Sequence, residues 1–412
     1  MPWLYITWIP GLLISLFLSW FALLALFAVK RRPPYFPAPP QTRFAVVIAA
    51  RNEEQVIGNL VASLLKQDYP HELFDVFVVP NNCTDRTAQA ALEAGAYILP
   101  PTAPVLSKGD ALGQVLPSLC QKPYHYDAFC FFDADNVVDS HFLAEMNRAF
   151  CAGARVAKGR NEAKNPYDSW VSGCYATYFG LINLFYNRAR ANVGLSAKLV
   201  GTGMAVSRQC LEDLGGWNTQ TITEDADLAA QCAAAGEQVF WVPNAVTYDE
   251  EPNSFRLSLT QRCRWTSGIM QVAGIRLASL LKGKKEHFWL RFDAVMNLLA
   301  PFLQALSPLL SVFSLLLHAC LIPTLLPSAV LAGLTGLALS YLGGMVGALT
   351  VTCLCGRKVR RMWKGIIGFP IFLASWMGIN VYSLFRKTTV WKEIHHCRNL
   401  SAEELPCLRN TG

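Results

Sequence analysis

The distribution of apolar segments constrains this chain more than any other feature. Its first 29 residues carry no charged side chain, and residues 11–29 are a nearly continuous run of Leu, Phe, Ala, Ile and Trp. About 20 apolar residues suffice to cross the hydrocarbon core of a bilayer. The run lacks the basic start and the A-x-A exit of a secretory signal. We therefore predict a retained transmembrane helix over residues 1–29.

Basic residues set the expected orientation of that helix. Lys30, Arg31 and Arg32 follow it directly, inside a proline-rich linker that we assign to residues 30–41. Because positive flanks stay on the cytosolic side, the N-terminus is expected outside and the following residues in the cytosol. The chain as a whole is expected in the cell (plasma) membrane.

Apolar sequence returns near the C-terminus. We expect membrane segments within residues 293–385, with candidate spans at 295–317, 324–352 and 365–384, and a cytosolic tail over 386–412. The first two spans would form a hairpin that returns to a basic cluster at residues 357–361. The third span has basic residues on both flanks, so crossing, re-entrant and interfacial placements all stay open.

Composition excludes an ordinary soluble enzyme. Charged residues make up only 16% of the chain, whereas soluble domains carry about 25%. The net charge of +7 comes largely from residues beside apolar segments, which indicates membrane topology and argues against a nucleic-acid partner.

Between the membrane segments, residues 42–252 have the pattern of a soluble α/β domain. Short apolar strands alternate with helical periodicity, which predicts βαβ units and a mostly parallel, Rossmann-like sheet. In such sheets ligands bind beyond the carboxyl ends of the strands. The expected strands are 44–49, 74–79, 96–99 and 128–132, and the expected helices are 53–67, 84–95 and 108–119.

Two acids follow the strand at 128–132. Asp133 and Asp135 stand one residue apart, an arrangement that is costly beside a buried strand unless a cation neutralises it. Mg²⁺ or Mn²⁺ takes hard oxygen ligands and bridges phosphate oxygens. The alternative is a pair of solvated loop acids.

A second acidic pair, Glu224 and Asp225, opens a helical stretch at 227–235. A carboxylate at a helix start can serve only as a cap. The functional alternative makes one of these acids a general base for an attacking hydroxyl.

Two cations, Arg262 and Arg264, stand beside an aromatic residue further along the chain, in Gln261-Arg262-Cys263-Arg264-Trp265. The forked donors of arginine suit a diphosphate, and a tryptophan face suits a sugar ring. The alternative, compatible with the first, is an amphipathic interfacial helix within residues 253–292.

Two glycine turns complete the set of motifs. Lys108 precedes a glycine at a helix start, where it could serve a phosphate. Gly201, Thr202 and Gly203 form a turn that lets the backbone approach a ligand closely.

In this order, and framed by membrane segments, the motifs resemble the membrane-integrated family 2 glycosyltransferases, the group of processive cellulose, chitin and hyaluronan synthases. The resemblance covers about residues 43–265 together with the membrane frame. It is carried by Ala49-Ala50-Arg51-Asn52-Glu53, Asp133-Ala134-Asp135, Gly201-Thr202-Gly203, Thr223-Glu224-Asp225 and Gln261-x-x-Arg264-Trp265.

The resemblance implies a GT-A fold, a UDP-sugar donor, a divalent cation and inversion at the anomeric carbon. It makes Asp133 and Asp135 the metal and diphosphate ligands, and Asp225, with Glu224 beside it, the catalytic group. Trp391 would belong to a cytosolic element after the last membrane segment. The remaining implied roles are donor binding by Ala50, Asn52, Glu53, Lys108, Gln261 and Arg264, and acceptor binding by Trp265, Gly201, Thr202 and Gly203.

One position departs from the family pattern. Relatives usually have an Asp after the second strand that contacts the nucleotide base, and Asn81 stands there instead. An amide still offers paired hydrogen bonds to a uracil edge. Asp85 is the alternative base contact.

The expected function is metal-dependent transfer of a sugar from a UDP-sugar to a growing saccharide. Two alternatives stay open: transfer to a lipid acceptor, ceramide-like or polyprenyl phosphate, and a membrane scaffold that has lost activity. The sugar, the linkage and the oligomeric state are not determined by the sequence.

Overall fold

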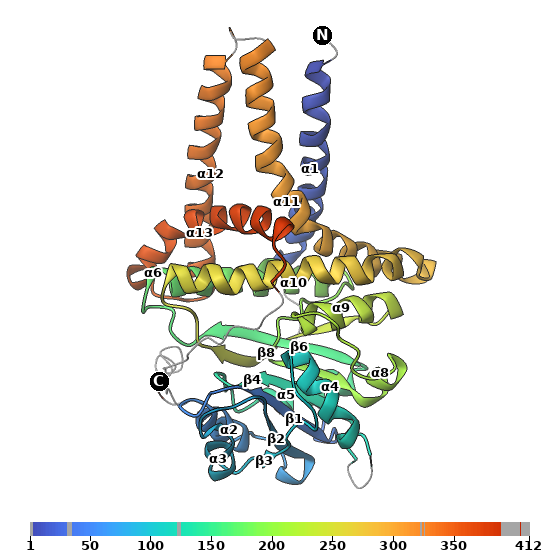
Figure 1. Ribbon diagram of the computed structural model, residues 1–412. Helices are drawn as coiled ribbons and strands as arrows, with labels where there is room; N and C mark the ends of the chain where they lie inside the picture. Colours follow the sequence, from blue (N-terminus) through green and yellow to red (C-terminus); the bar gives the residue numbers. More distant parts are fainter. Residues whose placement is uncertain are drawn as a thin grey trace.

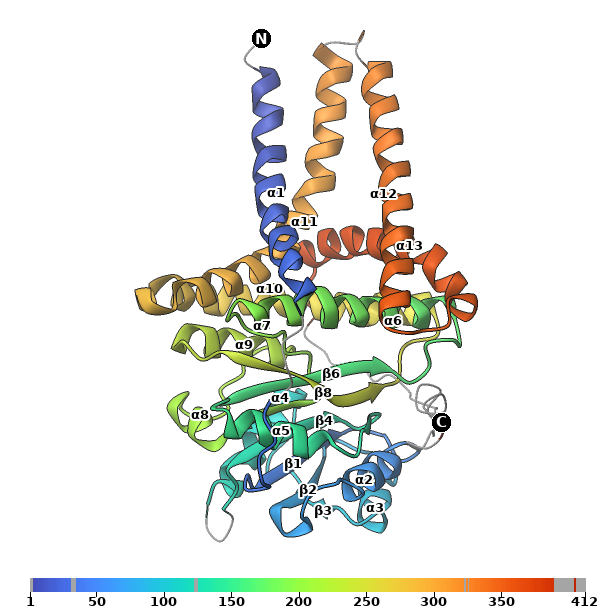
Figure 2. The ribbon, with the colours of Figure 1, turned by 180° about the vertical axis from the view of Figure 1, so that it is seen from behind.

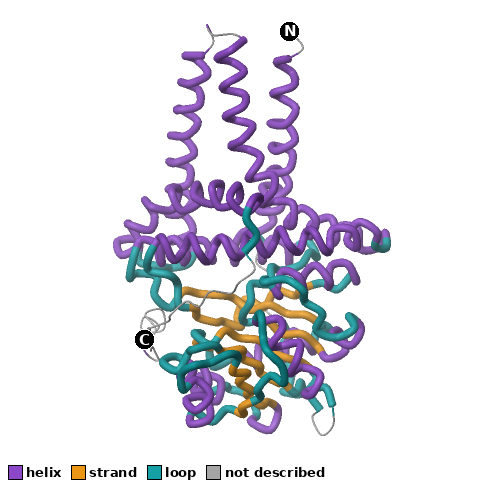
Figure 3. Tube along the Cα trace, viewed as in Figure 1, coloured by secondary structure: helices purple, strands orange, loops and turns teal. Residues whose placement is uncertain are grey.

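The computed structural model describes residues 3–30, 35–121, 125–321, 324, 326–388 and 404. An α/β part occupies one end of the molecule, and a layer of helices lies across it (Figure 1). Helices α1 (Trp3–Leu26), α11 (Phe288–Leu321) and α12 (Leu326–Leu354) project away from this layer on the side opposite the sheet. Figure 3 shows the same division, with the strands gathered at one end and only helices at the other.

The α/β part is built on one sheet of eight described strands in the order β3-β2-β1-β4-β7-β6-β8-β5. Neighbours from β3 to β4 run parallel, as do β6 and β8, whereas β7 is antiparallel to both β4 and β6. The sheet is therefore mixed. The strands are β1 (Phe44–Ala50), β2 (Phe74–Pro80), β3 (Tyr97–Ile98), β4 (Ala128–Asp133), β5 (Val137–Val138), β6 (Val156–Ala163), β7 (Met204–Ser207) and β8 (Val239–Asp249).

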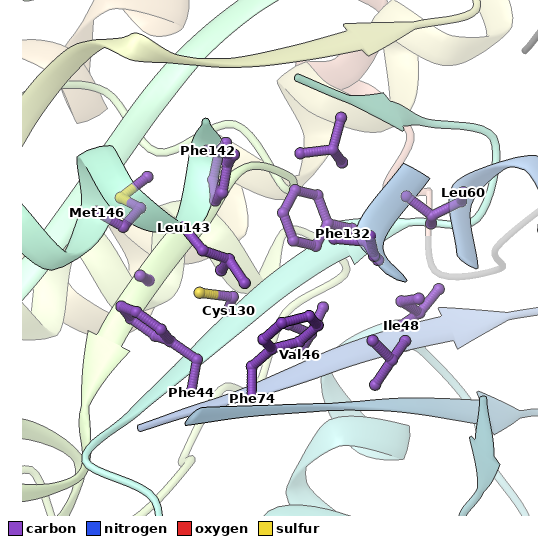
Figure 4. Packing of buried hydrophobic residues seen from close by; sticks show 14 of the residues in the cluster. Phe44, Val46, Ile48, Leu60, Phe74, Cys130, Phe132, Phe142, Leu143 and Met146 are labelled. Carbon is purple, nitrogen blue, oxygen red and sulfur yellow. The ribbon is translucent and has the colours of Figure 1, made fainter. Parts of the chain in front are cut away.

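Apolar side chains cover both faces of this sheet, which explains why its parallel strands are continuous apolar runs. All seven residues of β1 are buried. On one face, alternate residues such as Phe44 and Phe132 pack against Phe142 and Met146 of α5 (Figure 4). The opposite face packs against α4, α8 and α9. The helices are α2 (Ile57–Leu65), α3 (Thr87–Glu93), α4 (Lys108–Leu119), α5 (Phe142–Cys151), α8 (Arg208–Asp213) and α9 (Glu224–Ala235).

The four strands expected from the sequence are present, and each of their ends lies within one residue of the expected position. Strands β5 to β8 were not expected. In β6 the apolar pattern is interrupted by Lys158, Arg160, Asn161 and Glu162. The sequence of β6 therefore lacks the apolar run that identifies a buried strand. Antiparallel β7, inserted between β4 and β6, makes the sheet less parallel than the sequence pattern predicts.

Helices α6 (Trp170–Leu181), α10 (Phe255–Lys282) and α13 (Val359–Phe385) lie crosswise to α1 and α12, between the sheet and the projecting helices (Figures 1 and 2). Helix α13 is long and apolar enough to cross a membrane. It nevertheless packs on α6 and α10, so its orientation corresponds to the interfacial alternative for the third C-terminal segment.

Within the described residues, three helices have the length and apolar composition of membrane spans: Lys285–Phe313, Pro327–Leu354 and Val359–Phe385. The first of these spans lies largely in α11, which begins in the crosswise layer and then bends away from the sheet (Figure 2). Helix α11 contains Pro301 and Pro308. Proline removes a helical hydrogen bond and favours such a bend. Trp391 lies outside the described residues.

A buried ion pair joins the two parts of the molecule. Arg190, in α7 (Arg188–Asn192), donates from Nε and Nη2 to the two carboxylate oxygens of Asp293 on α11, at 2.8 and 2.9 Å. Trp20 of α1 donates to the same carboxylate at 2.9 Å. Because a buried charge is costly without partners, this cluster ties both helices to the α/β part at one position.

Candidate active site

A cavity of about 670 Å³ lies between the strand ends of the sheet and the crosswise helices. It brings together residues that the sequence places more than 100 positions apart. Ten of the candidate residues line it: Lys108, Asp133, Asp135, Gly201, Thr202, Glu224, Asp225, Gln261, Arg264 and Trp265.

Asp133 and Asp135, at the end of β4, line this cavity. Lys108, the first residue of α4, places Nζ 2.5 Å from Oδ1 of Asp133. The same ammonium group lies 3.4 Å from a carboxylate oxygen of Glu224. Although burial opposes it, the charges of Asp133 and Glu224 raise the pKa of Lys108 above its ordinary value. The lysine is therefore a cation held between Asp133 at the end of β4 and Glu224 at the start of α9.

The glycine turn completes the contacts of Lys108, whose Nζ also donates to the Gly201 carbonyl at 2.6 Å. Gly201 has a left-handed φ of +71°, and a Cβ there would lie 3.6 Å from Asp133 Oδ2 and 3.8 Å from Asp225 Oδ2. Glycine thus leaves open the space between the two acids. The adjacent Thr202 hydroxyl accepts from the Asp133 backbone N–H at 3.2 Å.

Asp225 lies in the first turn of α9, with Glu224 before it. Burial and the neighbouring Glu224 carboxylate raise the pKa of Asp225 to about 7. A carboxylate with this pKa takes up a proton readily near neutral pH, as a general base must. Asp225 also lines the cavity, so it is a candidate base in addition to an acid at a helix start.

A second ion pair fixes the position of α9. Asp227, which is fully buried, accepts from Arg276 of α10 at 2.7 Å and from the Gln220 backbone N–H at 2.7 Å. Because α10 also carries the Gln261–Trp265 motif, this contact holds the two predicted motifs in one relative position.

The α10 motif divides between two faces of its helix. Gln261, Arg264 and Trp265 line the cavity, and Gln261 accepts a hydrogen bond from the Tyr175 hydroxyl at 2.7 Å. Arg262 points away from the cavity and donates to the Phe372 carbonyl of α13 at 2.8 Å. Of the two arginines in the motif, Arg264 is therefore the one available to a ligand.

The candidate residues near β1 and β2 lie at the same edge of the sheet but do not line the cavity, and neither does Gly203. Asn52, with a left-handed φ of 54°, accepts from the Thr84 backbone N–H at 2.7 Å and thereby links two loops. The Glu53 backbone N–H donates to Thr87 Oγ1 at 2.8 Å, and Ala50 ends β1.

Asn81 and Asp85 differ sharply in their surroundings. Asp85 accepts hydrogen bonds from Thr87 and from the Glu54 backbone N–H, and these lower its pKa although burial opposes them. Asn81 is 1% exposed, and both polar atoms of its side chain lack partners within the described part of the chain. An unpartnered buried amide is costly, so Asn81 is the better candidate for a base contact.

Three acids that the sequence analysis did not single out also line the cavity: Asp249, Glu250 and Glu251, at the end of β8. Asp249 accepts from Asn136 at 2.9 Å and from Asn161 at 2.8 Å. Burial, with Asp135 nearby, raises its pKa to about 8. A run of three consecutive acids was visible in the sequence. Because β8 was not predicted, nothing in the sequence indicated that this run lies near Asp135.

The chemistry of Asp133 and Asp135 fits a divalent cation. Both offer carboxylate oxygens to the cavity, and the Asp133 side chain is 43% exposed. Within the described residues, no group of three acidic, histidine or cysteine side chains forms a metal site. Mg²⁺ and Mn²⁺ can be held by one or two carboxylates together with substrate phosphates.

Comparison with known proteins decides the family. The model of the glycosyltransferase-like family 2 matches residues 39–268 of the chain. The chain belongs to this family. The matched range includes every motif from Ala50 to Trp265, and the predicted enzyme class, a glycosyltransferase, agrees with it.

Two groups of curated relatives are named for different products, a glycolipid and a polysaccharide. A beta-monoglucosyldiacylglycerol synthase from Nostoc sp. is 32% identical over 260 residues, which cover 60% of this chain and 54% of the relative. A poly-beta-1,6-N-acetyl-D-glucosamine synthase from Staphylococcus epidermidis is 22% identical over 261 residues, 61% of each chain. The chain thus spans about half to three fifths of the length of these relatives.

A solved structure supports the fold. The mannosyltransferase PcManGT from Pyrobaculum calidifontis, in complex with GDP-Man and Mn²⁺, superposes with a TM-score of 0.56 at 20% identity and covers 90% of this chain and 98% of its own. The predicted fold class, a GT-A sheet of Rossmann type with apolar helices, is confirmed.

Proposed function

We propose that this protein is a membrane-bound inverting glycosyltransferase that moves a sugar from a UDP-sugar to the hydroxyl group of a lipid. Its catalytic side faces the cytosol, where the donor is made and where the basic flank of α1 is expected. The sequence favoured a growing saccharide as acceptor and left a lipid as the alternative. The cavity now favours the alternative.

The supporting observation is the continuity of the cavity from the acids to the apolar helices. At one end it is lined by Asp133 and Asp225, and at the other by Phe17 and Phe21 of α1 and by Pro301 of α11. A polar wall that continues into an apolar wall between helices of membrane length fits an amphiphile. A soluble sugar chain would gain nothing from the apolar end.

In the proposed reaction the acceptor oxygen attacks the anomeric carbon, and the bond from that carbon to the donor diphosphate breaks. Asp225 takes the proton of the attacking hydroxyl. Arg264 and Lys108 bind the departing diphosphate. Asp133 and Asp135 would hold the divalent cation, which supplies additional positive charge to the diphosphate when bound.

A growing saccharide remains a second candidate because of Trp265. Its indole lines the cavity and packs edge-on against Tyr175, with ring centroids 6.0 Å apart. Such a rigid aromatic surface suits an acceptor sugar. The scaffold alternative is disfavoured by the convergence of Asp133, Asp135 and Asp225 on one cavity.

The test is product analysis with purified protein in lipid nanodiscs. UDP-glucose, UDP-N-acetylglucosamine, UDP-galactose and UDP-glucuronate are each supplied with Mn²⁺ or Mg²⁺, with diacylglycerol or ceramide in the nanodisc. We expect metal-dependent UDP release and a lipid that carries one sugar, both abolished in Asp225→Asn. Label found only in a polymer would refute the lipid acceptor, and no transfer from any donor would refute the enzyme.

A further inference from the structure

A polar network occupies the helical end of the cavity, where the surrounding side chains are apolar. Trp376 Nε1 lies 3.3 Å from Thr266 Oγ1, and the Thr266 hydroxyl lies 3.2 Å from Asn380 Oδ1. Asn380 Nδ2 lies 2.9 Å from Gln304 Oε1. These four residues come from α10, α11 and α13, and all four line the cavity.

One set of hydrogen bonds joins all four side chains. The indole N–H can only donate, so Thr266 accepts from Trp376. The Thr266 hydroxyl donates to Asn380 Oδ1, and Asn380 Nδ2 donates to Gln304 Oε1.

This order leaves one donor at the end of the network, the Nε2 amide group of Gln304. Asn380 and Thr266 are 1% and 2% exposed, whereas Gln304 is an exposed residue on the cavity wall. Within the part of the chain that the structure describes, only Asn380 hydrogen-bonds to Gln304. The cavity therefore presents an oriented N–H donor.

The position of Gln304 indicates which kind of oxygen it binds. It lies on α11 about one turn beyond Pro301, and the same cavity is lined by the apolar residues Leu18, Leu373 and Met377. In a bilayer, ester carbonyl groups lie between the polar head groups and the acyl chains, and this cavity offers the same change from polar to apolar lining. An ester carbonyl accepts hydrogen bonds and has no proton to donate, so it is a suitable partner for the Gln304 amide N–H.

We propose that Gln304 is the binding residue for an ester carbonyl of the acceptor lipid, and that the Trp376–Thr266–Asn380 relay orients its amide. The acceptor class is thereby an acyl ester lipid with a free hydroxyl group. The inference rests on the proposed function, because it assumes a lipid acceptor whose hydroxyl reaches Asp225. It makes α13 part of the acceptor site, beyond its role in packing.

The experiment compares two acceptors, a 1,2-diacylglycerol and the 1,2-dialkylglycerol of equal chain length, which keeps the hydroxyl but lacks the carbonyls. Wild-type protein in nanodiscs is expected to show a KM for the ester at least about fivefold below that for the ether, the range of one hydrogen bond. Gln304→Leu and Gln304→Glu should raise the KM for the ester and make the two lipids equal. Thr335→Val, which removes a hydroxyl of α12 that donates to Leu331 outside the cavity, is the matched control and should keep the preference.

The outcomes separate the two proposals. If wild-type protein glycosylates neither lipid, the lipid acceptor itself is refuted. If it glycosylates both lipids equally, or if both Gln304 variants keep the ester preference, the role of Gln304 is refuted while the lipid acceptor stands. A preference that is lost in both Gln304 variants and kept in Thr335→Val supports the inference, and agreement of the two variants excludes a folding defect specific to one of them.

Discussion

The two ends of the cavity are built on different principles. At the sheet end, Asp133, Lys108 and Glu224 come from the ends of β4, α4 and α9 and fix one another through charge at 2.5 and 3.4 Å. At the helical end, Gln304 and Asn380 are held by neutral hydrogen bonds among apolar side chains. The first arrangement suits a charged diphosphate, and the second suits an uncharged lipid backbone.

The comparison shows that charged binding residues are easier to identify from a sequence than neutral ones. Buried charges are costly, so paired acids beside an apolar strand stand out as candidates for function. Neutral amides on apolar helices do not stand out, because a single Asn or Gln is compatible with ordinary packing. Four changes distinguish the two ends, in order of decreasing expected effect.

The largest effect is expected from Asp225→Asn. The amide cannot accept the proton of the acceptor hydroxyl, so kcat should fall on the order of a thousandfold. Donor affinity, measured by calorimetric titration with UDP and Mn²⁺, should stay within about threefold of wild type, because the diphosphate contacts are untouched. Transfer at a near wild-type rate would disprove the role of Asp225.

The next largest effect is expected from breaking the Arg190–Asp293 ion pair, which joins the α/β part to α11. Asp293→Asn leaves the buried Arg190 charge without its partner, which should lower the free energy of unfolding by about 3 kcal/mol. Thermal denaturation in detergent measures this loss. Asn297 donates to Asp293 and lines the cavity, so the substitution should also displace its side chain. The KM for the lipid should therefore rise more than the KM for the donor. An unchanged melting temperature would contradict the assigned role of the pair.

At the sheet end, Asn81→Ala removes the buried amide that has no hydrogen-bond partner among the described residues. UDP binding should weaken by about tenfold, the value of one to two hydrogen bonds in a buried site, while the KM for the lipid stays constant. The neighbour Asn82 donates to the Val105 carbonyl at 2.8 Å and has a φ of 51°, which glycine adopts freely. Asn82→Gly is therefore the matched control, and equal losses in both variants would refute base recognition by Asn81.

The smallest effect concerns pH. Asp225 must be ionised to act as a base, so kcat/KM for the donor should fall as the pH drops through about 7. Glu224→Gln removes a negative charge that raises this pKa, so the acidic limb should move to lower pH, by less than about one unit. A limb that moves to higher pH would contradict the assignment.

Much of the sheet end was predictable from the sequence. Continuous apolar runs identify β1, β2 and β4, because strands covered on both faces need no alternation. The motif residues that follow them lie where parallel strands end, and Asp133, Asp135 and Asp225 do share one cavity. Asp249 was missed, because β8 pairs with polar β6 and neither strand has a simple apolar pattern.

Charge spacing and hydropathy alone determined the α/β class, the apolar helices and the acids that line the cavity, because these depend on local periodicity and on the cost of burying charge. Tertiary structure alone decided that α13 lies crosswise, that Arg262 faces away from the cavity while Arg264 lines it, and that Gln304 meets Asn380 across 76 positions of sequence. Those outcomes depend on which helix faces pack together. Many pairings of apolar faces are nearly equal in transfer free energy, and only the assembled packing selects one of them.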